Sequence, residues 1–174
     1  MTKPEKAEYD AYYERYVSLV NEEGVLETLA SQPGELKTSL AGLPDVRGSY
    51  SYEDGKWSIK EVLGHLNDGE RFFAYRILRI SRGDTTPIEG FEQDGYIEYA
   101  RSNARSIADL IEEFRLLREA NMFLLNNLNQ EDWLRMGTAS GLPVSVRALA
   151  YIMSGHVTHH IHILNERYLV NLDD

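Results

Sequence analysis

Five histidines are the residues of this sequence whose type and spacing suggest chemistry, and four of them lie near its carboxyl end. His156 and His160 are four residues apart in a segment with helical hydrophobic spacing. That interval places two imidazoles on one side of a helix, about one turn apart, which suits a shared cation. His65 lies in a second helical segment and offers a third nitrogen ligand. Three protein ligands leave positions open for water or substrate, as in catalytic rather than structural metal sites.

The helical phase of the last segment points these side chains inward. Successive helical residues rotate by about 100°, so with Val146 as the origin His160 falls at about 40° and His156 at about 80°. Both positions lie within the apolar arc of the segment. His159 lies at the edge of that arc, where it could line the site without binding the metal or lie on the surface. His162 lies on the far side, and we expect it to meet solvent.

The segment around His65 shows the same arrangement. Val62, Leu66 and Phe73 share an apolar face, and His65 lies about 60° from Val62 on it. Gly69 follows His65 by four residues on the same face, where its missing side chain would leave room beside His65 for a ligand or another helix. A buried imidazole without a partner costs about 1–3 kcal/mol, and a divalent metal would satisfy all three rings. The alternative is that the rings are core residues hydrogen-bonded to carbonyl groups.

Other side chains near the histidines are weaker candidates. Asp68 follows His65 by three residues and Glu61 precedes it by four. Each could accept a hydrogen bond from an imidazole or act as a base on water, and the alternative is a solvated acid on an exposed edge. Phe91 and Tyr96 could roof the pocket as substrate contacts, with ordinary loop packing as the alternative.

Helices must position these residues, and the hydrophobic pattern predicts five helical segments. They cover approximately residues 5–21, 24–40, 58–81, 106–128 and 144–169. Pro33 and Gly34 interrupt the second segment and either kink it or mark a start. Ser58 and Glu61 form a capping box at the start of the third segment. Glu70 lies on the apolar side of that segment, where we expect it to pair with an arginine across the bundle.

The remaining segments are predicted to be connections. Residues 83–102 form a linker long enough to be functional or partly helical, residues 137–143 form a turn, and no segment alternates convincingly over strand length. The sequence therefore predicts an all-α fold, a four-helix bundle with an additional N-terminal helix. We expect one domain over residues 1–174, with its core at about 22–170.

Composition excludes several classes of partner. The 174 residues include 28 acidic and 18 basic side chains, a net charge of −10, which repels phosphate backbones. The densest basic stretch, Arg76, Arg79 and Arg82, has the spacing of a solvated helix side. No apolar run approaches the ~20 residues that span a bilayer. The absence of cysteine excludes thiolate ligands and fits a reducing compartment. We therefore expect a cytoplasmic protein that binds neither nucleic acid nor membrane.

Three stretches resemble the DinB/YfiT-like superfamily of four-helix metal-binding proteins. They are residues 56–66, with the sequence KWSIKEVLGHL; residues 83–91 with the following Asp94 and Tyr96; and residues 148–160, from ALAYI to GHVTHH. The similarity spans about residues 12–170. Members bind zinc or nickel through three histidines, which correspond here to His65, His156 and His160.

The resemblance also implies an activity and an assembly. Relatives include S-transferases that use a low-molecular-weight thiol, an isomerase of a thiol adduct and metal-dependent hydrolases, and many are homodimers. This chain has Ile161, His162 and Ile163 where many members have Arg-Gly-Gln, and Val157 where some have an acidic residue. The resemblance therefore supports the metal ligands more than any role tied to those side chains.

Two functional hypotheses follow from these observations. The first is a divalent-metal-dependent enzyme acting on a small-molecule substrate, by thiol transfer in preference to hydrolysis. The alternative is a non-catalytic dimeric bundle that binds a metal or a small ligand, because no convincing base stands beside the predicted metal.

Overall fold

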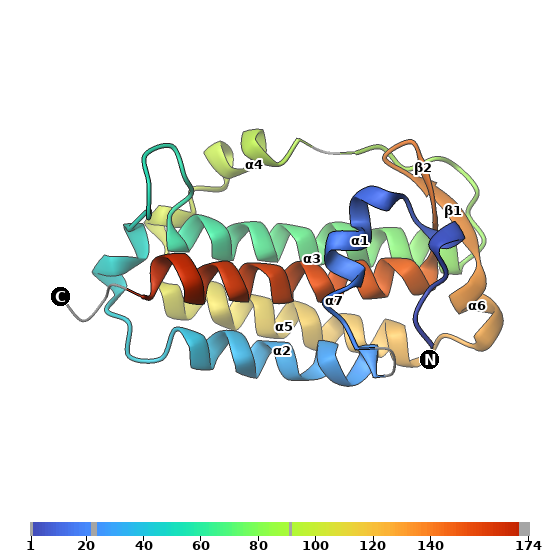
Figure 1. Cartoon of the computed structure of the whole chain (residues 1–174), viewed down its shortest axis with the longest axis horizontal. Helices are drawn as coiled ribbons and strands as arrows, with labels where there is room; N and C mark the ends of the chain where they lie inside the picture. Colours follow the sequence, from blue (N-terminus) through green and yellow to red (C-terminus); the bar gives the residue numbers. More distant parts are fainter. Residues whose placement is uncertain (1, 22–23, 91, 171–174) are drawn as a thin grey trace.

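The computed structural model describes residues 2–21, 24–90 and 92–170. Four long helices lie side by side in it (Figure 1) and end where their sequence signals predict: α2 (Val25–Ser39), α3 (Ile59–Ser81), α5 (Ile107–Asn126) and α7 (Val146–Ile163). α3 and α2 each pack against both α5 and α7. The predicted four-helix bundle is therefore confirmed. Among the described residues, no helix combines the length and apolar character needed to cross a bilayer.

Shorter elements connect and cover the bundle. They are α1 (Glu14–Val17), α4 (Gln93–Ala100), α6 (Gln130–Leu134), β1 (Met136–Ala139), β2 (Leu142–Ser145), 3-10 turns at Lys6–Glu8, Ala11–Tyr13, Asp45–Ser49 and Ser102–Ala104, and a π-helical turn at Leu164–Tyr168 that extends α7. The predicted linker after α3 contains α4, so it is partly helical.

The start of α3 has the predicted capping box. The Ser58 side chain accepts a hydrogen bond from the Glu61 amide, and the Glu61 carboxylate accepts one from the Ser58 amide. Two amides that have no partner within the helix are thereby satisfied. This cap sets where α3 begins and so fixes the helical phase at which His65, two turns later, faces the bundle interior.

Pro33 does not interrupt α2, which continues through it to Ser39. Proline has no amide hydrogen, so the carbonyl of Leu29, four residues earlier, loses its helical donor. The Arg118 guanidinium on α5 donates to that carbonyl at 2.6 Å. A side chain from a neighbouring helix thus replaces the missing hydrogen bond and joins α2 to α5.

A buried polar layer crosses the bundle between two apolar clusters, which contain Met153 and Val157 of α7 respectively. Arg118 donates to both carboxylate oxygens of Glu70 at 2.6 and 2.8 Å, and to Gln32 at 2.8 Å. Gln32 in turn donates to the Ser154 carbonyl at 2.7 Å. The predicted ion pair of Glu70 with an arginine is confirmed, and its network ties all four long helices together near the histidines.

The N-terminal segment departs from the predicted single helix over residues 5–21. It forms two 3-10 turns and the four-residue helix α1, and Tyr9 between the turns is extended, with φ −156° and ψ 158°. The Asp10 carboxylate accepts a hydrogen bond from the Tyr12 amide, which starts a new turn there. The tyrosines at helical spacing therefore do not mark one continuous helix: Tyr16 lies in α1, which packs on α7, whereas Tyr12 is 55% exposed.

A β-hairpin replaces the predicted turn at residues 137–143. β1 and β2 are antiparallel, with Met136 opposite Ser145 and Ala139 opposite Leu142. Ser140 and Gly141 connect them, both with positive φ, at 54° and 77°. Positive φ at both central residues is typical of the tight turns that match strand twist. Strands of four residues are too short to show alternation, so the sequence pattern did not reveal them.

Candidate metal centre

Three imidazoles converge inside the bundle from two helices. His65 comes from α3, and His156 and His160 come from α7, one helical turn apart. A ligand nitrogen from each ring lies within 4.8 Å of the other two. The Nε2 atoms of His65 and His156 are 2.8 Å apart. The inward phase predicted for all three residues therefore brings them to one point.

The three rings are held in the neutral form by burial. Their exposed fractions are 4% for His65, 6% for His156 and 9% for His160. Burial lowers the pKa of His65 to about 4, although the charge of Asp94 opposes this shift. Burial, followed by the neighbouring histidines, lowers the pKa of His156 and His160 well below the ordinary value. Neutral imidazoles have a free lone pair, the form in which histidine binds metals.

The donor set fits a divalent cation. His160 Nδ1 is buried and has no hydrogen-bond partner. In the described part of the chain, the only hydrogen bond among the three rings joins His65 to His156, and none reaches a backbone carbonyl. The alternative of core histidines satisfied by carbonyl groups therefore finds no support. Three nitrogen ligands suit zinc or nickel.

Aromatic side chains pack around the rings and restrict their orientation. Trp57 lies against His65 with ring centroids 4.8 Å apart. Tyr16 of α1 meets both His156 and His159 edge-on at 5.5 Å. Gly69 lies against His156 rather than His65, because a Cβ at this position would be 3.2 Å from the His156 Cε1 atom. Its missing side chain gives the His156 ring its space.

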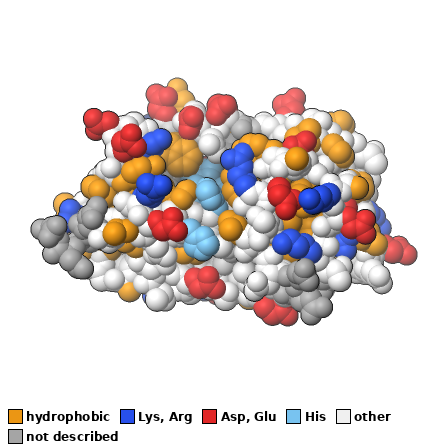
Figure 2. Space-filling model, viewed as in Figure 1, with side chains coloured by type: hydrophobic (Ala, Val, Ile, Leu, Met, Phe, Trp, Pro, Cys, Tyr) orange, Lys and Arg blue, Asp and Glu red, His pale blue; other side chains and the backbone are white. Residues whose placement is uncertain are grey.

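Two cavities are lined by residues of the histidine cluster. The first, which we call the tyrosine cavity, has a volume of about 290 Å³ and is lined by Tyr12, Tyr13, Tyr16, His65, Gly69, Phe73, Arg76, Glu92, Gln93, Ser140 and His156. The second, of about 310 Å³, contains Trp57, Asp94 and His160. Figure 2 shows histidine side chains at the surface near the middle of one face.

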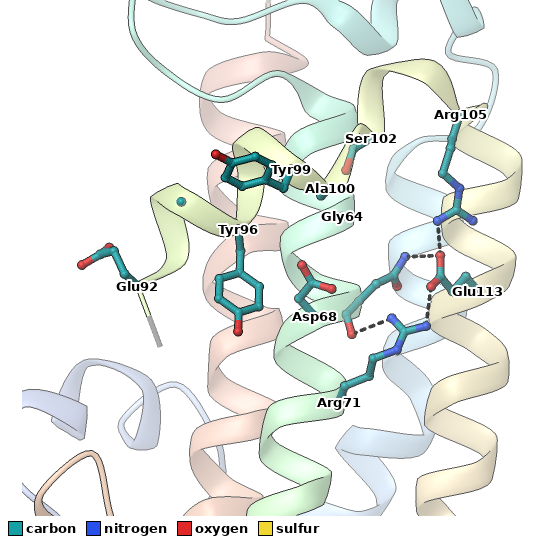
Figure 3. Close-up of a pocket in the computed structure, with 12 residues that line it drawn as sticks. Gly64, Asp68, Arg71, Glu92, Tyr96, Tyr99, Ala100, Ser102, Arg105 and Glu113 are labelled. Atoms are coloured by element: carbon teal, nitrogen blue, oxygen red, sulfur yellow. Dashed lines mark hydrogen bonds and ion pairs between the residues drawn. The ribbon is translucent and has the colours of Figure 1, made fainter. Parts of the chain in front are cut away.

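Two of the predicted neighbours lie in a different place. Asp68 and Tyr96 line a third cavity of about 710 Å³ between α3, α4 and α5. Figure 3 shows Asp68 beside Tyr96 there, opposite the ion pairs of Arg71 and Arg105 with Glu113. Burial raises the pKa of Asp68. Neither residue lines the two cavities that contain the histidines.

The structure places all the remaining candidate residues except Phe91. Both carboxylate oxygens of Glu61 serve the start of α3, accepting from the Ser58 amide and from Asn103 Nδ2. His159 is half-buried beside Tyr16, at the edge of the cluster as predicted, and His162 is exposed. Phe91 lies outside the described residues.

Three residues at the site were not identified from the sequence. Asp94 of α4 acts electrostatically on His65 and lines the cavity that contains His160. Trp57 was expected only to anchor the start of a helix. Arg76 was interpreted as part of a solvated helix side, and this was wrong, because it is 4% exposed and lines the tyrosine cavity. Asp94 could have been identified from its position in the linker that resembles the superfamily.

Comparison with known proteins identifies the family of this chain. Residues 28–164 match the model of the DinB superfamily. The chain belongs to the DinB superfamily. This superfamily member is 26% identical over 140 residues to a protein of Geobacillus thermodenitrificans named "Putative metal-dependent hydrolase", covering 78% of this chain and 79% of that protein.

A solved structure shows the same fold. The structure of YfiT from Bacillus subtilis, described as "a probable metal-dependent hydrolase with an unusual four-helix bundle topology", superposes with a TM-score of 0.76. The match covers 94% of this chain and 90% of YfiT at 18% sequence identity. At this identity, the likeness establishes the fold of this DinB-superfamily protein and not its reaction.

Proposed function

We propose that this protein is a metal-dependent hydrolase of a small molecule, in which His65, His156 and His160 hold zinc or nickel. The observation that carries the proposal is the convergence of three buried, neutral imidazoles, one of which has a ring nitrogen without a partner. Hydrolysis is favoured over thiol transfer because both similar proteins are described as metal-dependent hydrolases.

Several residues of the chain would have separate roles at such a centre. A divalent cation bound there would supply Lewis acidity, which polarises a substrate carbonyl or phosphoryl group and makes water more acidic. The three histidines would hold the cation, and three protein ligands would leave at least one coordination position for water or substrate. Trp57 and Tyr16 keep the His65 and His156 rings in place. The tyrosine cavity is large enough for a small substrate.

Asp94 is our candidate for the group that accepts a proton during hydrolysis. Its charge acts on His65, and it lines the cavity that contains His160. A carboxylate near the reacting water contributes typically 10²–10⁴-fold to a rate. We therefore expect Asp94→Asn to lower turnover by about 10²-fold or more while metal uptake is unchanged.

Metal titration tests the centre itself. Chelator-treated protein without a His-tag is titrated with Zn²⁺ or Ni²⁺, comparing the wild type with His160→Ala and His162→Ala. We expect one equivalent to bind to the wild type and to His162→Ala, whose histidine is exposed on the same helix. We expect His160→Ala to lose affinity by about 100-fold or more. No uptake by the wild type, or equal uptake by both variants, would contradict the proposal.

Turnover assays test the reaction. Metal-loaded protein is given a panel of esters, amides and phosphoesters, with and without a low-molecular-weight thiol. Hydrolysis without thiol that disappears in His160→Ala is the expected result. Turnover only in the presence of thiol would replace hydrolysis by thiol S-transfer. Metal uptake with no turnover of any substrate would instead favour the non-catalytic module.

A further inference from the structure

Arg76 is buried next to the candidate metal centre without a full set of partners. It lies on α3, is 4% exposed, and its Nε atom has no hydrogen-bond partner. Its Nη2 atom donates to the Ser140 hydroxyl at 2.9 Å and to the Glu89 carbonyl at 3.5 Å. Burial lowers the pKa of Arg76, and a hydrogen bond with Tyr13 opposes this shift. All these partners are neutral groups.

Arg118 is a buried arginine with a structural role, and it has a full set of partners. It is 1% exposed, and its guanidinium donates to both oxygens of Glu70, to Gln32 and to the Leu29 carbonyl. Among the described residues, by contrast, no carboxylate forms an ion pair with Arg76. A buried charge without a counter-ion is strongly unfavourable. Burial of the Arg76 charge is therefore unfavourable in free energy, and no ion pair in the described part of the chain compensates for it. A bound anion would offset this penalty.

The position of Arg76 shows where such an anion would bind. Arg76 lines the tyrosine cavity together with His65 and His156. It lies eleven residues after His65, about three turns along α3, with Gly69 between them on the side of the cavity. One cavity thus presents two candidate metal ligands and, three helical turns away, an arginine without a counter-ion.

Neighbouring groups complete an anion-binding end of this cavity. Ser140 is held with φ 54° by the hairpin turn, and this turn presents its hydroxyl to Arg76. Tyr13 adds a second hydroxyl. Glu92 also lines the cavity, but its carboxylate accepts from the Asp94 amide at the start of α4 and makes no ion pair with Arg76. One cation with neutral hydroxyl groups matches a singly charged, planar carboxylate better than a doubly charged phosphate.

We propose that the tyrosine cavity binds a carboxylate group of the substrate, with Arg76 as the residue that recognises it. This inference rests on the proposed function, because it names the substrate class of the same site. The substrate would be a small molecule whose acidic group lies at the Arg76 end of the cavity and whose reacting group lies at the histidines. Gly69, Tyr13 and Ser140 then act as the walls that admit and orient this acid.

Carboxylate binding tests the inference without an activity assay. Butyrate and hexanoate are compared with the matching neutral amides, butyramide and hexanamide, by calorimetry and by the shift in melting temperature. Both methods are applied to metal-free and to zinc-loaded protein, since a carboxylate can also bind zinc directly. We expect the carboxylates to bind metal-free wild type and the amides to bind at least about 10-fold more weakly.

Variants at Arg76 separate recognition from structural support. Arg76→Gln should lose carboxylate binding to metal-free protein by about 10- to 100-fold, while Arg76→Lys retains part of it. Arg82→Gln, at the exposed end of the same helix, makes the same change in charge and should bind as the wild type does. Without ligand, Arg76→Gln should melt at the same or a higher temperature, whereas loss of a structural residue would lower it.

Three outcomes would overturn the inference. They are equal binding of acids and amides, unchanged carboxylate binding in Arg76→Gln, and no binding of any acid to metal-free wild type. The proposed function fails separately, if zinc is not taken up by the wild type. Carboxylate binding that depends on Arg76 in a protein without zinc uptake would keep the acid site and remove the metal centre.

Discussion

Glu70 and Arg118 lie at the centre of the bundle, where each side chain is 1% exposed. A buried ion pair stabilises a fold only when its remaining hydrogen-bonding groups also have partners. Here Asn121 donates to Glu70 at 3.0 Å, while Gln32 and the Leu29 carbonyl accept from Arg118. The pair is therefore satisfied on both sides, and removing one partner would leave a charge buried alone.

We predict that Glu70→Ala lowers the free energy of unfolding by about 3–5 kcal/mol, because it leaves Arg118 without its counter-ion. Urea denaturation of the metal-free protein provides the measurement. Glu119→Ala is the control, since Glu119 pairs with Arg115 on the surface of α5 with 58% of its side chain exposed. The control should change stability by less than about 0.5 kcal/mol. Equal effects of the two substitutions would disprove a structural role for the buried pair.

At the scale of elements, the N-terminal segment covers the histidines only because α7 has a glycine at the contact. A Cβ added to Gly155 would lie 2.0 Å from the Tyr16 carbonyl oxygen. This close approach brings the Tyr16 ring onto His156 and His159. The absence of one side chain on α7 therefore sets how α1 forms a wall of the tyrosine cavity.

Gly155→Ala is expected to push α1 away from α7 and to lower the free energy of unfolding by about 1–3 kcal/mol. Limited proteolysis should then cut the N-terminal segment faster than in the wild type. Gly34→Ala is the matched control, because no atom lies within 4 Å of a Cβ placed there. That change, inside α2, should stabilise the protein by up to about 1 kcal/mol. A stable Gly155→Ala variant with unchanged proteolysis would show that the contact is dispensable.

At the scale of the whole molecule, one acidic side chain joins the N-terminal segment to the start of the last long helix, α7. Glu8 accepts hydrogen bonds from Ser145 Oγ at 2.7 Å and from the Arg147 guanidinium. Burial alone would raise the pKa of Glu8, but the hydrogen bonds from Arg147 and Ser145 together leave it below its ordinary value of 4.5. The ionised form of Glu8 therefore favours the folded state.

The sign of the pH dependence follows from this lowered pKa. Between the folded and unfolded pKa values, the unfolded state binds more protons, so the contribution of Glu8 is full above about pH 4.5 and is lost as the pH falls. We predict that Glu8→Gln is less stable than the wild type by on the order of 1 kcal/mol at pH 7. The difference should shrink towards pH 3, as urea denaturation at several pH values can measure. Glu98→Gln, an exposed site on α4, should show no such trend.

Much of the site was predictable because helical phase is a local property. The capping box at Ser58 and Glu61 sets the start of α3, and from there the 3.6-residue repeat directs His65 and Glu70 inward. The same repeat on α7 separates buried His160 from exposed His162. These positions follow from intervals of three and four residues, which a sequence contains in full.

Other features depended on distances between segments, which no local pattern contains. The bundle places α4 so that Asp94 influences His65, while Asp68 and Tyr96, the expected neighbours, face a separate cavity. Burial of Arg76 results from packing of the hairpin and the N-terminal segment over α3, so its regular spacing with other arginines was misleading.

The sequence by itself determined the four long helices, the inward direction of three histidines, and an acidic residue in the core. The tertiary structure alone decided that the three rings meet within 4.8 Å, that Glu70 pairs with Arg118, and that Arg76 shares a cavity with His65. The physical reason is that a helix fixes directions about its own axis. The distances between groups on different helices are set by side-chain packing throughout the core.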